Sequence, residues 1–188
     1  VMIQFVLYDT VFSFINCHLE SGQNATEKRL SMAQEILSEI GLFSEKDRIE
    51  ADAIADVNFF MGDLNFRFNR TYSQHAGDVQ ISPSLVYKLD QLHRVRSEDK
   101  AFPEYEENEI TFLPTYKREY TSNAFVNKKE QCPSYTDRIL VKNNSNCPLT
   151  IQHYGCHEEY WGSDHRPVFT HVNVVTQPQQ YLSAPALL

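Results

Sequence analysis

Two runs of β-branched and aromatic residues open the chain. They span residues 2–7 and 11–17 and are separated by the short polar stretch of residues 8–10. Side chains of these types pack well on a pleated sheet, and a break of three residues suits a tight turn. The pattern therefore predicts a β-hairpin at the start of the chain.

A helical period follows the hairpin. Leu30, Ala33 and Leu37 recur on one face of a helix. Asn24 lies ahead of them, with Glu27 three residues later, which is the spacing of a capping box. We expect a helix from about residue 24 to residue 40.

A second helix is predicted over residues 82–92. Ser82 and Pro83 provide an N-cap and a first helical position. Leu85, Leu89 and Leu92 then recur at i, i+4 and i+7, so they would share one apolar face.

Further apolar runs at residues 57–61, 139–142 and 168–175 are short enough for strands, and the last follows Pro167, which suits the start of a strand. Strands and helices alternate without an internal repeat, which favours a layered α/β fold. We expect one domain over residues 1–175. Residues 176–188 contain two prolines and no period, so we expect an irregular tail.

Composition narrows the class of protein. Of the 188 residues, 41% are hydrophobic and 22% are charged, which is enough apolar material for one globular core. The net charge of −8 argues against non-specific coating of nucleic acid. No apolar run approaches the roughly 20 residues of a membrane-spanning helix. The four cysteines form no CxxC pair, which favours reduced, cytosolic thiols.

Four polar clusters each follow a strand-like run. They are Asn-Cys-His-Leu at 16–19, Gly-Asp-Leu-Asn at 62–65, Pro-Ser-Tyr-Thr-Asp-Arg at 133–138 and Gly-Ser-Asp-His-Arg-Pro at 162–167. Each alone is compatible with a turn or a surface ion pair. Together they deliver histidines, aspartates and an asparagine to strand ends, a set suited to metal-assisted hydrolysis of a phosphate ester. Neither a zinc-hydrolase motif nor a Gly-x-Ser-x-Gly nucleophile turn is present.

Five ordered motifs resemble those of the inositol polyphosphate 5-phosphatase branch of the endonuclease/exonuclease/phosphatase superfamily. They lie at residues 14–19, 60–67, 112–117, 133–140 and 163–168. The resemblance implies a four-layer α-β-β-α sandwich of the deoxyribonuclease type, with this chain matching only its C-terminal part. The sequence begins at Val1, inside a strand pattern, so it resembles a piece of a longer chain.

By this resemblance, Asp63 would orient or deprotonate the attacking water, and Asn65 would hold that water or the scissile phosphate. His165 would stabilise the phosphate or act as general base, with Asp164 beside it as a ligand of Mg²⁺. The family's further Mg²⁺ ligands, an Asn and a Glu, would precede Val1.

The resemblance also assigns supporting residues. His18 would face the phosphate, and Asp137 would accept a hydrogen bond from an active-site histidine and set its tautomer. Which carboxylate is the base stays open.

The substrate-binding residues implied by the resemblance are Tyr116, Lys117, Lys129 and Arg138. For Arg138, buried support of neighbouring carboxylates is an equal alternative. Gln131 stands where many relatives have arginine, which weakens one phosphate contact. We expect the aromatic pair of Tyr160 and Trp161 to pack under the last loop, the alternative being an aromatic lip at a membrane.

These observations predict Mg²⁺-dependent removal of the 5-phosphate from phosphoinositides or soluble inositol polyphosphates, in the cytoplasm and peripherally at membranes. The alternatives are a nuclease of the same superfamily or a non-catalytic remnant that binds phosphoinositide or protein. We expect residues 1–188 alone to be unstable or inactive, because missing sheet partners would leave Phe12, Phe14, Phe59 and Met61 partly uncovered.

Overall fold

The structure is a computed structural model, and it describes residues 1–39, 55–69, 88–126, 132–144 and 147–176. Its strands and helices are β1 (Met2–Leu7), β2 (Thr10–His18), α1 (Thr26–Glu39), β3 (Val57–Asp63), α4 (Gln91–Ser97), β4 (Asp137–Asn143), β5 (Leu149–Cys156) and β6 (Val168–Val174). The predicted tail from residue 177 onward, and the start of the predicted second helix, lie outside the described residues.

The first sheet has the strand order β1-β2-β3-β4. β1 and β2 form the predicted antiparallel hairpin, β2 runs parallel to β3, and β4 is antiparallel to β3. In this register His18 lies opposite Asp63, and Asp63 lies opposite Asp137. Three residues from distant motifs therefore meet at one edge of the sheet.

A second sheet pairs β5 with β6 in antiparallel fashion. β6 begins directly after Pro167, as predicted. β5 was missed by the sequence analysis, because Gly155 and the polar residues Gln152 and His153 interrupt its apolar pattern and its register shifts between Ile151 and His153.

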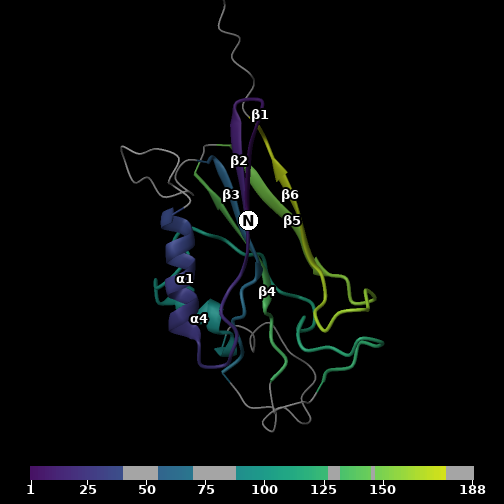
Figure 1. The fold of residues 1–188 in the computed structure, drawn as a ribbon. Helices are drawn as coiled ribbons and strands as arrows, with labels where there is room; N and C mark the ends of the chain where they lie inside the picture. The colour runs from purple at the N-terminus through teal and green to yellow at the C-terminus, as the bar shows by residue number, and fades with distance from the viewer. Residues whose placement is uncertain (40–54, 70–87, 127–131, 145–146, 177–188) are drawn as a thin grey trace, which may run out of the picture.

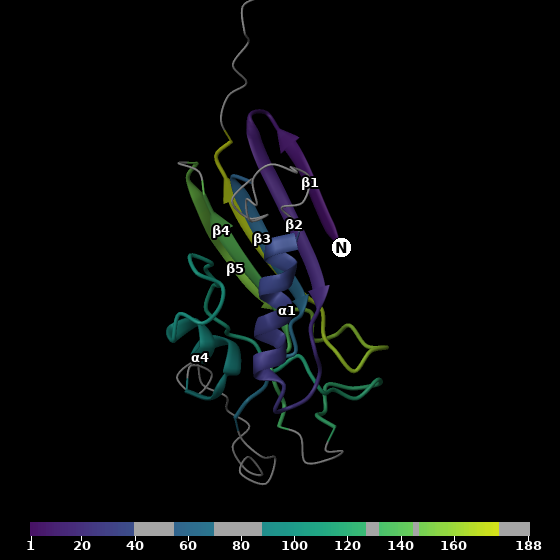
Figure 2. The same cartoon turned by 60° about the vertical axis from the view of Figure 1, so that its left-hand side comes forward.

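The elements stack in three layers (Figure 1), with α1 and α4 on one face of the first sheet and β5 and β6 on the other. Figure 2 shows α1 lying along the helix-covered face. Ile15, Phe60 and Leu140 pack there with Ala33 of α1 and Leu92 of α4. On the opposite face a cluster joins the two sheets, formed by Phe12, Val57, Phe59 and Val141 with Leu149, Ile151, Val172 and Val174. The expected layered α/β class is confirmed.

Helix α1 buries the predicted face, with Leu30, Ala33 and Leu37 in the core. It begins at Thr26, so Asn24 lies one residue too early to be the N-cap and the predicted capping box is wrong. The fully buried Arg29 holds this end instead, since it donates to the carbonyls of Glu20 and Gly22.

The second helix differs from its prediction at its C-terminal end. Asp90 adopts an extended conformation and caps α4, its side chain accepting from the backbone N–H of His93. Leu92 therefore belongs to a new helix and does not continue a helix from Leu85. The sequence pattern missed this break because leucine spacing does not report the conformation of the aspartate between the leucines.

The expectation that four apolar side chains of β2 and β3 are partly uncovered is also partly wrong. Phe12 and Phe59 are buried, because the β5–β6 sheet covers them, whereas Phe14 and Met61 are half-buried. The exposed apolar residues are concentrated on β1, where Ile3 is 61% exposed.

None of the four cysteines forms a disulfide, as their spacing predicted. No helix among the described residues is long and apolar enough to cross a membrane.

Candidate active site

The C-terminal end of β3 depends on a glycine. Gly62 has a φ of +126°, and a Cβ atom on it would lie 2.1 Å from the carbonyl oxygen of Cys17 on the neighbouring strand. Only glycine fits this approach of two backbones. The strand can therefore remain paired up to Asp63, which places that carboxylate at the sheet edge.

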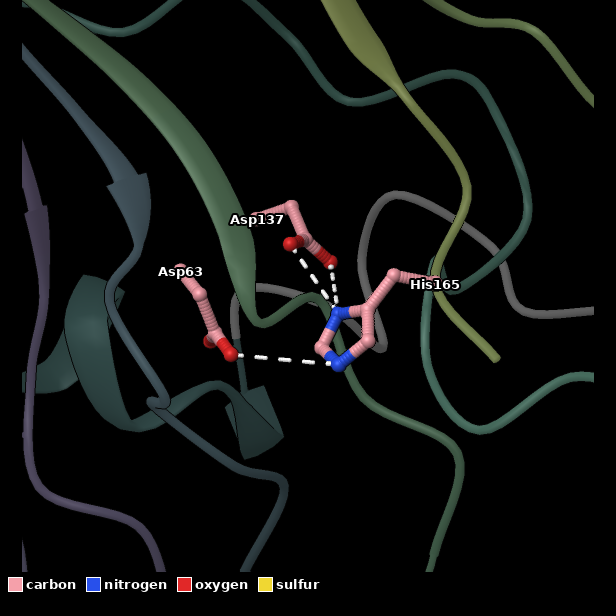
Figure 3. Close-up of side chains that lie close together, drawn as sticks. All are labelled: Asp63, Asp137 and His165. Atoms are coloured by element: carbon pink, nitrogen blue, oxygen red, sulfur yellow. Dashed lines mark hydrogen bonds and ion pairs between the residues drawn. The ribbon is translucent and has the colours of Figure 1, made fainter. Parts of the chain in front are cut away.

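Asp63, Asp137 and His165 converge at this edge (Figure 3). Nδ1 of His165 lies 2.9 Å from Oδ2 of Asp137, and Nε2 lies 3.8 Å from Oδ2 of Asp63. One possible ligand atom from each of the three residues lies within 4.8 Å of the others. The predicted catalytic residues from three separate motifs thus form one cluster.

Asp137 holds the histidine. Its Oδ2 accepts hydrogen bonds from the hydroxyls of Thr115, at 2.6 Å, and Thr136, at 2.9 Å, as well as facing His165. These contacts fix the carboxylate, which in turn orients the imidazole ring. Thr115 and Thr136 lie inside the motifs at residues 112–117 and 133–140, but no role was predicted for them.

The charges of the cluster are coupled. Burial and the nearby charge of Asp137 raise the pKa of Asp63. Burial alone would lower the pKa of His165, but the hydrogen bond and charge of Asp137 outweigh it, so the pKa of His165 is raised. The site therefore combines a carboxyl group that accepts a proton more readily than usual with a histidine that keeps one more readily.

His18 lies at the exposed rim of the cluster, where its Nε2 is 3.4 Å from Oδ2 of Asp63 and its side chain is 72% exposed. Asn65 lies beneath the cluster and is 2% exposed. Its Nδ2 donates to the carbonyl of Leu19 and its Oδ1 accepts from Arg67. The structure shows a structural role for this amide, and its contact with water or phosphate stays a prediction.

Tyr116 and Lys117 border the cluster. The Tyr116 ring lies 4.4 Å from the ring of His165, measured between centroids. Nζ of Lys117 lies 2.8 Å from Oδ2 of Asp164. Burial would raise the pKa of Asp164, but the hydrogen bond from Lys117 outweighs it and lowers the pKa. Asp164 thus pairs with a lysine and is not part of the Asp63 cluster, and its predicted contact with a metal stays a prediction.

Arg138 contributes to the lining of the pocket beside the cluster, but its guanidinium is held by carboxylates. Its guanidinium is 2% exposed and donates to Oδ1 of Asp90 at 2.8 Å and to Oε2 of Glu107 at 2.7 Å. The predicted substrate contact is replaced by the alternative, buried support of carboxylates. Lys129 and Gln131 lie outside the described residues.

A pocket of about 350 Å³ opens beside the cluster. Its lining residues are Asn16, Met61, Gly62, Asp63, Asp137, Arg138, Ile139, Tyr160, Ser163, His165, Arg166, Pro167 and Val168. Tyr160 and Trp161 are 65% and 52% exposed, so the prediction that this pair packs under the last loop is wrong. Their loop is held by backbone, since Gly162 N–H donates to the carbonyl of Tyr120, which leaves the rings outside.

The donor set of the cluster fits a hard divalent cation. Carboxylate oxygens are the protein ligands that Mg²⁺ and Ca²⁺ prefer, and Mg²⁺ is commonly held by one or two carboxylates together with substrate phosphates. Asp63 is the best placed ligand, because no backbone N–H among the described residues donates to its Oδ2, whereas its Oδ1 accepts from the backbone N–H of Asn65. Asp137 is already engaged by His165 and two threonines. A bound cation would polarise a phosphate oxygen.

The layered fold and the Asp-His cluster at its strand ends are those of the endonuclease/exonuclease/phosphatase class. Residues 1–171 match the family described as Endonuclease/Exonuclease/phosphatase family 2, and the chain belongs to this family.

Two curated relatives are phosphatidylinositol trisphosphate 5-phosphatases. The chain is 31% identical over 179 residues to phosphatidylinositol 3,4,5-trisphosphate 5-phosphatase 2A of Danio rerio, covering 89% of this chain and 14% of that protein. It is 33% identical over 184 residues to phosphatidylinositol 3,4,5-trisphosphate 5-phosphatase 2 of Homo sapiens, with the same coverage of 89% and 14%. The chain therefore spans a small part of these relatives.

Solved structures agree on the fold. The inositol polyphosphate 5-phosphatase domain of spSynaptojanin, in complex with inositol (1,4)-bisphosphate and a calcium ion, has a TM-score of 0.76 and 28% identity, covering 92% of this chain and 51% of that chain. A Cimex nitrophorin has a TM-score of 0.70 and 24% identity, covering 92% of this chain and 58% of that chain, and this likeness concerns the fold alone. The resemblance inferred from the motifs is confirmed.

Proposed function

We propose that the protein containing this chain is a Mg²⁺-dependent phosphomonoesterase that removes the 5-phosphate from phosphoinositides or soluble inositol polyphosphates. The observation that carries the proposal is the convergence of Asp63, Asp137 and His165 beside one pocket. It is supported by the relatives named as phosphatidylinositol 5-phosphatases and by a similar structure that holds an inositol bisphosphate and calcium.

The side chains divide the work of hydrolysis. Asp63 orients a water and accepts its proton as the water oxygen attacks phosphorus. His165, whose pKa is raised, presents a protonated ring to the phosphate oxygens, where negative charge develops. Asp137 keeps that ring in place through Nδ1. The phosphorus–oxygen bond to the inositol then breaks, and the departing inositol oxygen takes up a proton from water.

Lys117 and Tyr116 are the proposed substrate contacts, because both lie beside His165 on the loop before β4. Lys117 is now neutralised by Asp164, and a substrate phosphate would compete for its ammonium group. The net charge of −8 argues against a nuclease, which needs a broad basic surface for its backbone contacts.

We further propose a cytoplasmic location with peripheral attachment to membranes. Tyr160 and Trp161 support the membrane attachment, since both rings are exposed, Tyr160 lines the pocket, and aromatic rings of this type favour the membrane interface. Vesicle sedimentation of the complete protein should fall when both are replaced by serine. Unchanged sedimentation would refute this attachment.

The catalytic proposal is tested by Asp63→Ala in the complete protein, with release of phosphate from an inositol 5-phosphate substrate measured in the presence and absence of Mg²⁺. Loss of a catalytic acid or base lowers the rate by about 10²–10⁴-fold. Asp9→Ala is the matched control, because Asp9 lies in the exposed turn at the far end of the β1–β2 hairpin. A folded Asp63→Ala variant with near wild-type turnover would defeat the assignment, and substrate binding without turnover by the wild type would favour the non-catalytic alternative.

A further inference from the structure

Arg67 is a buried cation that none of the proposed catalytic roles uses. It is 7% exposed, and within the described part of the chain no ion pair joins it to a carboxylate. Its partners among the described residues are neutral. Nε donates to the carbonyl of Asn65 at 3.2 Å, Nη2 donates to Oδ1 of the same asparagine, and the guanidinium lies 4.6 Å from the ring centroid of Tyr116. Burying a charge among neutral groups is unfavourable, so this placement calls for an explanation.

The first consequence of Arg67 concerns Asn65. A guanidinium can only donate and a carbonyl can only accept, so the amide is held with Oδ1 toward Arg67 and Nδ2 toward the carbonyl of Leu19. Asn65 also has a φ of 56°, and its backbone N–H donates to Oδ1 of Asp63 at 3.0 Å. Arg67 thereby holds the residue that orients the carboxylate of Asp63.

The second consequence concerns Tyr116. Its ring contacts both the guanidinium of Arg67, at 4.6 Å from the ring centroid, and the ring of His165, at 4.4 Å between centroids. His165 in turn faces Asp63 at 3.8 Å. The contacts therefore close into a ring around the site, running from Asp63 through Asn65, Arg67, Tyr116 and His165 back to Asp63.

We propose that Arg67 is a positioning residue, which acts on catalysis by holding Asn65 and the ring of Tyr116 in one arrangement around the reacting groups. This inference rests on the proposed phosphatase function. Arginine suits the task because its planar fork can hydrogen-bond and stack at the same time, which a lysine ammonium on a flexible stem cannot do equally well.

The test is a double-mutant cycle in the complete protein, with kcat and KM measured on the same inositol 5-phosphate substrate. Arg67→Met should lower kcat by about 10²-fold, the scale of a small misplacement of catalytic groups. In a Tyr116→Leu background, Arg67→Met should lower kcat by a clearly smaller factor, because the ring that Arg67 holds is already absent. Tyr116→Phe is the matched control, since it keeps the ring and should keep the full effect of Arg67→Met.

Arg67→Lys should restore part of kcat, and unfolding midpoints identify any variant whose loss is only structural. If Arg67→Met does not fold, the cycle is run with Arg67→Lys. Effects of Arg67 and Tyr116 that add within about twofold would overturn the positioning role, because independent sites add to that degree. If the wild type itself releases no phosphate, the proposed function fails, and the positioning role fails with it. If the wild type is active and the effects of the two substitutions add, only the positioning role fails.

Discussion

Replacing Arg138 with methionine tests whether this residue supports the fold or binds substrate. The side chains of Arg138, Asp90 and Glu107 are 2%, 0% and 7% exposed, and the arginine bonds to both carboxylates at 2.7–2.8 Å. Burial alone would lower the pKa of Arg138, but the charges of the two carboxylates outweigh it and hold the pKa well above its usual value. Removing the arginine therefore leaves the buried Asp90 without the cation that faces it, and leaves Glu107 with the more distant Arg96, at 3.8 Å.

The expected loss follows from that geometry. Breaking a buried ion pair from one side costs about 3–5 kcal/mol in free energy of unfolding, against a total of about 5–15 kcal/mol for a domain. Urea denaturation of the complete protein should show a clear fall in the unfolding midpoint for Arg138→Met. Arg94→Met is the matched control, because Arg94 forms an exposed ion pair with Glu98 at the C-terminal end of α4. Its replacement should leave the unfolding midpoint essentially unchanged.

Two further measurements make the reasoning refutable. Adding Asp90→Asn and Glu107→Gln to Arg138→Met should recover part of the stability, since the penalty comes from unpaired carboxylates. KM of the folded Arg138→Met protein should stay near the wild-type value. A midpoint equal to that of Arg94→Met, together with a large rise in KM, would show that Arg138 binds substrate after all.

Three other outcomes are expected. Lys117→Ala should raise KM more for substrates with a 4-phosphate than for those without one, as measured by steady-state kinetics, and equal effects would remove Lys117 from that role. Asp137→Asn should lower the pKa of His165 and move the alkaline limb of the pH–rate profile to lower pH. In the wild type the raised pKa of His165 contributes stability below its unfolded value, which is lost as pH rises through the folded value. Residues 1–188 expressed alone should show neither a cooperative thermal transition nor turnover, because β1 leaves residues such as Phe5 exposed. A cooperative thermal transition together with release of phosphate would contradict this expectation.

Local patterns predicted most of the first sheet and its helix. The β1–β2 hairpin, β3 and α1 each follow from a repeat of apolar residues within one segment, which is the information a short stretch of sequence contains. The apolar pattern did not predict β5, because it is interrupted at Gly155 and the pairing register shifts between Ile151 and His153. It did not predict the helix break at Asp90 either, because that break depends on the N-cap formed by the Asp90 side chain.

The motifs were sufficient to nominate Asp63, Asp137 and His165, since residue type and order already pointed to phosphate chemistry. They were not sufficient to say which groups meet. Register alone places Asp63 opposite Asp137, and only the packing of the loop before β6 brings His165 to both.

The sequence by itself thus determined the class of fold, the family and the residue types of the site. Tertiary structure decided that Arg138 pairs with Asp90 and Glu107, that Asp164 pairs with Lys117, and that Asn65 is held by Arg67. The physical reason is that apolar periodicity is set by neighbours along the chain, whereas the partner of a charge is set by whichever group from a distant segment is buried beside it.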